Sequence, residues 1–550
     1  MKNIFKALSI VAAGVSAMTL TGCLEETFPT SGVTESQLNS STATGEAMVW
    51  SMPAFYNEFQ VATDGHYDWG YGSIMHIRDV MTADMAIATS NYDHYTPWEQ
   101  NRNISEVYAS TGFVWVFLNK MVQPANDAIR FYKQHPENKS YQVYLGMGYA
   151  FRAAGYLDLA RMYEFLPNDK VNAVNDYGND VTNLTVPYVT EYTTQAQAIN
   201  NPRLPHYKTD KFDGANMSDS ILRDLNEAER LIAGADRADK TLPDLSVVYG
   251  LKARYYMWNE NYAEAAKYAD LAIVTSGCRP LTKDEWLNTS SGFNTIESPA
   301  WMWGSQVVEE NSVVRSGILN WTSWCSNETT YGYANAGPRL LCGTDEFYSR
   351  IDDNDFRKLS WVAPEGSPLQ GKELFVDNVF SPYAGGQYQL EPYSSLKFRP
   401  AMGGFEVYST GSCSGYPLMR VEEMYFILAE AQAHTNPEQG KQTLLSFMRS
   451  HRNGLYRFAG TSQKDIIDEI VFQKRVELWG EGQSYFDIKR LNISVTRATS
   501  GSNFESYARM NTTGRPAWMN FVIVRSEGQN NAAVREWNNP STDGCYSPIM

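Results

Sequence analysis

Histidine and cysteine are scarce in this sequence, and they do not occur at the spacings that signal chemistry. Only seven histidines and six cysteines stand among its 550 residues. No Cys-x-x-Cys pair is present, so neither a zinc site nor a thioredoxin-like redox site is indicated. The His-Glu-x-x-His, Gly-x-Ser-x-Gly and phosphate-loop motifs are missing as well, so catalysis has no positive support in the sequence.

Basic charge and long apolar runs are also lacking. The chain has 62 acidic against 46 basic residues, a formal charge of -16, whereas phosphate backbones bind to basic faces, so no nucleic-acid partner is expected. Beyond residue 23 no apolar run approaches the roughly 18 residues of a membrane span. With 43% hydrophobic and 13% aromatic residues, the chain can nevertheless bury a large core.

The N-terminus has the pattern of a secretory signal. Residues 1–22 contain Lys2 and Lys6, no acidic residue, and a mostly apolar stretch from Ala7 to Leu20. The stretch Leu20 to Cys23 resembles the lipobox of bacterial lipoproteins, which implies that lipid is attached to Cys23 after cleavage. The alternative is an ordinary signal peptide with a cysteine near its cleavage site by chance.

Residues 23–45 are predicted to be the lipid anchor and a flexible tether, because Thr30 to Gly45 is rich in Ser, Thr and Gly. Glu25 and Glu26 resemble the surface-export signal of lipoproteins in the Bacteroides group. Without the signal's two lysines the formal charge becomes -18. Five cysteines remain, and one or two disulfides are possible, but their pairing cannot be read from spacing.

Residues 46–279 are predicted to form an N-terminal helical part. Apolar side chains recur at helical spacing in a first helix, in which Pro124 should cause a kink: Val114, Phe117, Leu118, Met121, Val122, Ala125, Ala128, Ile129 and Tyr132. A second helix is expected from Gln142 to Phe165, ending before Pro167.

The stretch from Val248 to Ile273 resembles a tetratricopeptide helix pair that turns at Asn259 to Asn261. Small and aromatic residues stand where two antiparallel helices pack closely: Ala253, Tyr256, Ala265, Ala269 and Ala272. One pair cannot bury its own face, so several stacked pairs are expected.

Residues 417–550 are predicted to be a C-terminal helical part. Val421 to Ala433 and Glu438 to His451 form another helix pair, and Thr461 to Trp479 forms a further helix that Ser462 caps. Its inward face is expected to include Ile466, Ile467, Ile470, Val471 and Leu478.

Between these helical parts, residues 280–416 lose helical periodicity and mix Gly, Ser, Asn and Pro with aromatic residues. So long an irregular segment is usually functional. The fold class expected is therefore mainly α: tetratricopeptide-like helix pairs with a long loop-rich segment packed on them, and residues 46–550 as one compact domain.

Four stretches resemble one family, the SusD/RagB outer-membrane nutrient-binding lipoproteins. They are WVFLNKMVQPAN (115–126), AFRAAGYLDLARMYEFLP (150–167), RVEEMYFILAEA (420–431) and QKRVELWGEGQSYFDIKR (473–490). Gln473, Lys474 and Ser484 depart from the residues usual in the last motif.

The resemblance implies a lipid-anchored protein at the outer-membrane surface that caps a TonB-dependent transporter and delivers glycans or peptides to it, without catalysis. The signature residues themselves are predicted to serve the fold. Trp479, Tyr485, Phe486 and Ile488 should pack in the core, and Glu477, Glu481, Asp487 and Arg490 should pair with other charges or cap helices.

A sugar needs exposed aromatic platforms beside hydrogen-bonding side chains, and three loop stretches have that mixture: Asp64 to Tyr71, Asn91 to Asn101 and Asn320 to Tyr333. From them the ligand-binding residues are predicted to be Trp69, Tyr71, Tyr95, Trp98, Asn101, Trp321, Trp324 and Tyr331. Each stretch could instead be local core. Trp301 and Trp303, in a more apolar run, are expected in the core.

No cofactor is expected. Asp352, Asp353, Asn354 and Asp355 could bind calcium through oxygen ligands, but they lack the spacing of an EF-hand loop, and a solvated turn is the alternative. Three other hypotheses stay open beside glycan delivery. They are a peptide-binding member of the same transport system, a surface glycoside hydrolase using two carboxylates, and a scaffold that binds protein partners on its helix pairs.

Overall fold

A computed structural model describes residues 42–88, 93–208, 214–327, 332–333, 339–373, 390–404 and 407–550. The chain separates into two units, Met1–Thr44 and Gly45–Met550. The predicted signal, Cys23 and most of the predicted tether lie outside the described residues. Along the described chain, no helix combines the length and the apolar character needed to cross a bilayer.

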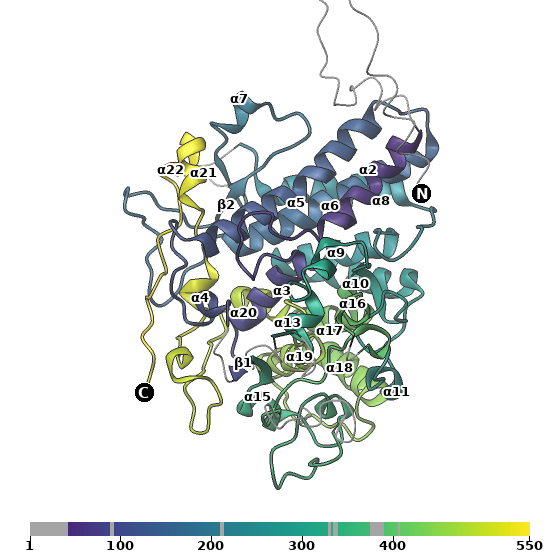
Figure 1. The fold of residues 1–550 in the computed structure, drawn as a ribbon, viewed down its shortest axis with the longest axis vertical. Helices are drawn as coiled ribbons and strands as arrows, with labels where there is room; N and C mark the ends of the chain where they lie inside the picture. Colours follow the sequence, from purple (N-terminus) through teal and green to yellow (C-terminus); the bar gives the residue numbers. More distant parts are fainter. Residues whose placement is uncertain are drawn as a thin grey trace, which may run out of the picture. The chain divides into compact units, whose positions relative to one another are not determined.

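Helices dominate the unit that begins at Gly45, which confirms the mainly α prediction. The longer helices of its first half are α2 (Thr42–Phe55), α3 (Tyr71–Val80), α5 (Ala109–Lys133), α6 (Lys139–Tyr163), α8 (Met217–Ile232), α9 (Leu245–Trp258) and α10 (Tyr262–Ser276). Neighbours in this series pack on one another, α5 on α6, α6 on α8, α8 on α9 and α9 on α10 (Figure 1). The result is the stack of helix pairs that the sequence predicts.

The α5 and α6 pair confirms two expected elements. The predicted apolar face of α5 is buried, and the helix continues through Pro124; the kink stays a prediction. Asn138 caps α6 by accepting hydrogen bonds from the Ser140 and Tyr141 amides. The helix ends at Tyr163, before Pro167, as expected.

The α9 and α10 pair turns where the sequence predicts. The Asn261 side chain accepts a hydrogen bond from the Glu264 amide at the start of α10, and Gly277 ends that helix at φ 63°. Ala253, Ala265, Ala269 and Ala272 are fully buried. Because these side chains are small, the two helices can pack closely.

The last third of the chain continues the stack. Its longer helices are α17 (Val421–Thr435), α18 (Pro437–His451), α19 (Gln463–Glu477) and α20 (Ser484–Arg490). Helix α17 packs against α10 as well as against α18 and α19. The N-terminal and C-terminal helix pairs therefore share one core.

The signature residues of this part form a buried cluster of charges. Glu477 pairs with Arg452 at 2.8 Å, Arg420 at 3.1 Å and Arg357 at 3.0 Å, and Glu481 pairs with Arg420 at 2.9 Å. Burial alone would raise the pKa of Glu477, but the three guanidinium groups hold it well below its ordinary value. These contacts confirm the prediction that the acidic signature residues pair within the fold.

In the described part of the chain, the strands form three two-stranded antiparallel sheets that join the irregular segments. They are β1 (Met85–Ala88) with β5 (Leu340–Gly343), β2 (Leu184–Pro187) with β3 (Arg203–Pro205), and β4 (Trp301–Gln306) with β6 (Gly415–Arg420). In the first, Met85 lies opposite Gly343 and Ala88 opposite Leu340. Trp301 and Trp303 lie on β4 and are buried, as expected.

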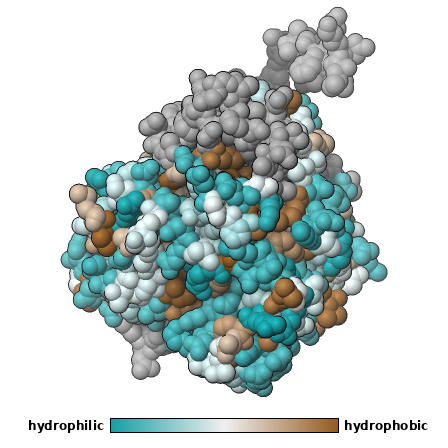
Figure 2. All heavy atoms as spheres, turned by 90° about the horizontal axis from the view of Figure 1, so that it is seen from below, coloured by the Kyte–Doolittle hydropathy of each residue, from teal (hydrophilic) through white to brown (hydrophobic). Residues whose placement is uncertain are grey.

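Short helices occur along the loops. They are α4 (Thr96–Glu99), α7 (Gln195–Ala198), α11 (Lys283–Trp286), α12 (Ser312–Arg315), α13 (Trp321–Cys325), α15 (Asp345–Arg350), α16 (Tyr408–Gly411), α21 (Arg525–Asn530), α22 (Ala532–Arg535), η1 (Phe356–Ser360), η2 (Ala401–Gly403), η3 (Ser506–Ala508) and η4 (Ala517–Met519). On the face in Figure 2, apolar side chains form small separate patches within a mostly hydrophilic surface.

Candidate functional site

The three aromatic stretches predicted to bind ligand meet at one place, which we call the aromatic junction. The Trp69 indole N–H donates to the Tyr95 hydroxyl at 2.7 Å. Tyr95 packs edge-on against Trp324, with ring centroids 4.9 Å apart. Trp69 also contacts Trp321, at 6.2 Å. Residues more than 200 positions apart in sequence are thus neighbours.

The prediction that these rings are exposed platforms is wrong. Side chains at the junction bury one another, and the exposed fraction is at most 3% for Trp69, Tyr95, Trp98, Trp321 and Trp324. Burying such rings removes 150–250 Å² each from water. All five belong to the main hydrophobic core, so the polar stretches that carry them fold onto that core. None of the five offers an open face to a sugar.

Two other predicted residues lie away from the junction. The Tyr71 hydroxyl, on a ring 9% exposed, donates to Asp158 of α6 and accepts from Arg78 at 2.9 Å. Asn101 is fully buried, and its amide contacts the Cys545 sulfur at 3.4 Å. Both side chains are buried, so their predicted exposure is wrong too. Their contacts join separate segments of the chain. Tyr331 lies outside the described residues.

Solvent reaches the junction at a rim that the sequence analysis did not single out. His66 and His94 are half-buried and stack with ring centroids 4.3 Å apart at 19°. Nδ1 of His66 lies 2.6 Å from the Tyr333 hydroxyl, and Tyr333 stacks on Trp324 at 3.5 Å. Both histidines lie inside the predicted stretches. The prediction there rests on the tryptophans and tyrosines and leaves the histidines out.

The loop that carries His66 is fixed by its own carboxylate. Asp68 accepts hydrogen bonds from the Ala62 amide at 2.7 Å and the Thr63 amide at 2.9 Å. Burial raises the pKa of Asp68, and these hydrogen bonds offset part of the rise. Gly70 follows at φ 105°, where a Cβ would stand 2.3 Å from the Tyr56 carbonyl oxygen. Only glycine fits this approach, so the turn into α3 requires it.

A buried ion pair lies next to His94, because Asp93 precedes it in the chain. Arg339 pairs with Asp93 at 2.7 Å, and neither side chain is exposed. Arg339 also donates to Nε2 of His76 at 2.9 Å. Burial lowers the pKa of His94 and, more strongly, of His76, and the Arg339 charge lowers both further. Both imidazoles are therefore neutral at pH 7.

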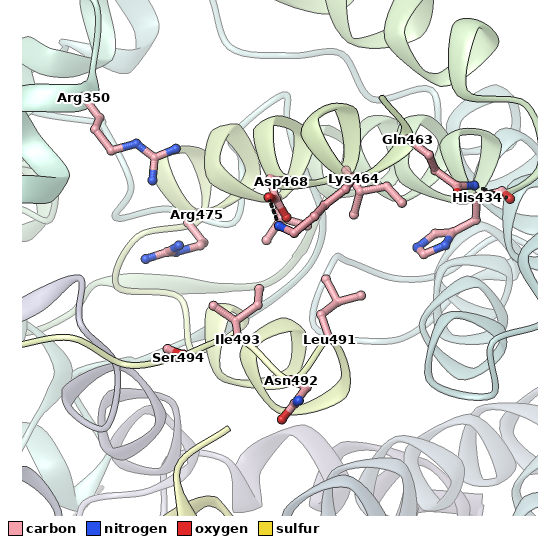
Figure 3. Close-up of a pocket in the computed structure, with 12 residues that line it drawn as sticks. Arg350, His434, Gln463, Lys464, Asp468, Arg475, Leu491, Asn492, Ile493 and Ser494 are labelled. Carbon is pink, nitrogen blue, oxygen red and sulfur yellow. Dashed lines mark hydrogen bonds and ion pairs between the residues drawn. The ribbon is translucent and has the colours of Figure 1, made fainter. Parts of the chain in front are cut away.

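A hollow beside helix α19, which we call the α19 groove, differs in chemistry from the aromatic junction (Figure 3). It measures about 660 Å³. Leu491 and Ile493 point toward α19 from below, Arg350 lies at one end, and His434 lies at the other. Ile467, predicted to face inward, packs against the core and also lines this groove. Aliphatic walls with charged ends lack the aromatic platform that a sugar ring needs.

The predicted calcium-binding acids make local contacts. Asp353 pairs with Lys358 at 2.7 Å, and Asp355 pairs with Arg357 at 2.7 Å. Asp352 accepts the Asn354 amide at 2.8 Å. Within the described part of the chain, no group of three potential metal ligands is close enough to hold an ion.

The five described cysteines are unpaired: Cys278, Cys325, Cys342, Cys413 and Cys545. Burial raises the pKa of the Cys342 thiol to about 12. A buried thiol of this kind is inert.

Solved structures of SusD-like proteins share this fold. A SusD-like carbohydrate-binding protein from Bacteroides vulgatus is 20% identical and superposes with a TM-score of 0.69, over 91% of this chain and 98% of that one. A SusD superfamily protein from Bacteroides thetaiotaomicron is 16% identical, with a TM-score of 0.65 over 90% and 99%. Surface glycan-binding protein A from the same species, in complex with laminarihexaose, is 14% identical, with a TM-score of 0.61 over 90% and 99%.

The sequence itself matches a family model in its last part. No curated protein matches the chain, whereas residues 342–549 match the model of the SusD family. That region contains both C-terminal signatures, from Arg420 and from Gln473 onward. The resemblance predicted from the sequence is thereby confirmed: residues 342–549 match the model of the SusD family, and SusD-like proteins share the fold of this chain.

Proposed function

We propose that this protein binds carbohydrate at a bacterial cell surface without altering it and passes it to a TonB-dependent outer-membrane transporter. The observation that carries the proposal is the aromatic junction, where three separate polar and aromatic stretches converge. The fold supports it, because structures of that fold include one solved with laminarihexaose. The lipobox ending at Cys23 supports the location.

We place the ligand contact at the rim of the junction. His66 and His94 present half-buried imidazole rings, and Tyr67, also half-buried, packs edge-on against Trp98 at 5.1 Å. Imidazole nitrogens exchange hydrogen bonds with hydroxyl groups, and ring faces receive the apolar C–H face of a sugar. Because His94 is neutral at pH 7, this rim suits an uncharged ligand.

Binding without turnover is the first test. The full-length protein, purified from membranes in detergent, is applied to a glycan array and to a peptide mixture, and bound glycans are then analysed for cleavage. We expect binding to glycans and no products. Preference for peptides would favour the peptide-binding alternative, and cleavage at enzymatic rates would favour the hydrolase.

Removing the rim is the second test. The double variant His66→Ala, His94→Ala should weaken glycan binding roughly 30-fold, since two hydrogen bonds are lost and each contributes about 1 kcal/mol. His135→Ala is the matched control, because His135 is half-buried at the end of α5. Equal affinity of all three proteins would remove the site from the junction.

Delivery requires a partner, and co-purification tests it. Tagged protein solubilised from membranes of its own host should retain a TonB-dependent transporter, with and without added glycan. A preparation that retains other proteins and has no affinity for small ligands would instead support the scaffold hypothesis.

A further inference from the structure

A second pocket opens between β2 and α7, in a segment that the sequence analysis passed over. Its volume is about 530 Å³, and residues from Tyr188 to Asn201 line it. In Figure 1, α7 stands well apart from α4 and α13, which carry residues of the aromatic junction. We call this hollow the tyrosine–amide pocket.

The lining has the composition that a neutral saccharide requires. Tyr188 and Tyr192 contribute aromatic rings, two threonines contribute hydroxyl groups, and Gln197, Asn200 and Asn201 contribute amides. None of the described side chains that line it carries a charge. Rings meet the C–H faces of a sugar, and amides donate to and accept from its hydroxyl groups.

The exposed ring is held in place before any ligand arrives. Tyr192 is 68% exposed, and such a side chain would ordinarily move freely. Here the Lys133 ammonium lies 4.7 Å from the ring centroid and donates to the Tyr192 hydroxyl at 3.3 Å. Lys133 is itself paired with Glu191. A platform fixed in this way loses little freedom when it binds.

The Tyr188 ring is held in place as well. The Tyr188 hydroxyl donates to Asp224 at 2.7 Å, and its ring lies 4.4 Å from that of Tyr156. The Asn201 amide donates to the Tyr188 carbonyl at 3.0 Å. The rings of Tyr188 and Tyr192, which both line the pocket, are therefore each held by contacts within the protein.

Hydrogen-bonding capacity remains for a ligand. Within the described chain the exposed Asn200 side chain makes no hydrogen bond. The side-chain oxygen Oε1 of Gln197 accepts a hydrogen bond from the Thr194 backbone amide at 2.9 Å. This bond orients the side-chain NH₂ group of Gln197 without using it as a donor. Two amides thus present unused donors beside an exposed ring.

We propose that the tyrosine–amide pocket is a second carbohydrate-binding site, specific for neutral saccharides and separate from the aromatic junction. The proposal rests on the proposed function and extends it from one site to two. A long glycan held at both places gains avidity over a short one, because its second contact is intramolecular. A glycan that leaves the junction then stays attached to the protein.

Stoichiometry tests the proposal. Full-length protein in detergent is screened against neutral polysaccharides (laminarin, starch, xylan and mannan) and against polygalacturonate, and the hexasaccharide of the bound polymer is titrated by calorimetry. We expect two sites in the wild type and one in Tyr192→Ala. Affinity for the parent polymer should fall about tenfold or more in this variant.

Matched variants show which part of the Tyr192 side chain the second site requires. Tyr192→Phe keeps the ring and should keep both sites, and Asn200→Ala should weaken the second. Tyr177→Ala is the control, because Tyr177 is 60% exposed and outside the pocket; Lys464→Ala in the α19 groove is another. The variants should unfold at the wild-type temperature, since the altered side chains are exposed.

The outcomes separate this proposal from the proposed function. One site in the wild type, with affinity unchanged by Tyr192→Ala, overturns the pocket and leaves the function standing. No binding to any polymer overturns both. Binding of polygalacturonate alone, lost in Tyr192→Ala, overturns the assignment to neutral saccharides.

Discussion

Trp321 illustrates how a residue in a polar stretch becomes core. It is 1% exposed, and its ring stacks on Tyr416 with centroids 4.9 Å apart and an angle of 18°. We expect Trp321→Ala to lower the free energy of unfolding by about 3 to 5 kcal/mol, as for other buried aromatic truncations. Urea denaturation measures it. Trp50→Ala, at a position 39% exposed, should change little.

This expectation differs from the one that sequence alone supports. An exposed Trp321 or Trp98 would lose ligand affinity on truncation and keep its stability. If Trp321→Ala has the same free energy of unfolding as the wild type but fails to bind glycan, the ring contacts ligand and is not part of the core.

His76 should make stability depend on pH. Burial and Arg339 lower its pKa well below the ordinary 6.5, so on acidification the unfolded chain binds a proton that the folded protein refuses. The free energy of unfolding is therefore unaffected by this group above about pH 6.5 and falls below it. Unfolding midpoints at pH 8, 6.5 and 5.5 should decline less in His76→Gln, whose amide can still accept from Arg339. Parallel curves would contradict this.

At the scale of elements, the helices are predictable because the spacing of apolar residues within each helix identifies its buried face. The spacing of Val114, Phe117 and Leu118 identifies the inner side of α5, and alanines identify where α9 and α10 pack. The loops carry no such periodicity. Whether Trp69 or Trp324 is buried depends on their meeting across the chain, which no local window of sequence contains. His66 and His94 lie within the predicted stretches, but their stacking joins two separate segments. The tyrosine–amide pocket lies within one segment, Tyr188 to Asn201, which no periodicity or motif marks.

Helix α19 gives the prediction at this scale. Its Glu477 faces Arg357, Arg420 and Arg452, all unexposed. Glu477→Gln removes the anion and leaves three guanidinium groups close together, so the free energy of unfolding should fall by about 3 to 5 kcal/mol. Because the folded pKa of Glu477 is depressed, its contribution is present above about pH 4.5 and is lost on acidification.

An exposed pair provides the control for this change. Glu264 and Lys267 lie 2.8 Å apart on the surface of α10, and Glu264→Gln should cost no more than about 0.5 kcal/mol. Glycan affinity should stay at the wild-type value in both variants. A Glu477→Gln protein as stable as the wild type would mean that the arginines find other partners.

At the scale of the whole molecule, one shared core holds surfaces of different chemistry. Helix α10 packs on α17 and so joins the two helical parts, while the aromatic junction and the tyrosine–amide pocket lie on loops outside that stack. The proposed binding of a long neutral polymer would therefore leave the helices undisturbed. None of the described helices could span a membrane, and the proposed attachment at Cys23 lies outside the described residues.

The stretch that resembles a lipobox and ends at Cys23 predicts attachment through lipid, and substitution of this cysteine tests the prediction. Each buried methylene contributes about 0.8 kcal/mol, and two or more acyl chains make anchoring durable. Wild-type protein should therefore pellet with membranes through high salt and alkaline carbonate, whereas Cys23→Ser should appear in the soluble exported fraction with its glycan affinity intact. Cys278→Ser, a half-buried cysteine in the folded body, should pellet like the wild type. If Cys23→Ser still pelleted, contacts with a membrane partner rather than lipid would hold the protein in place.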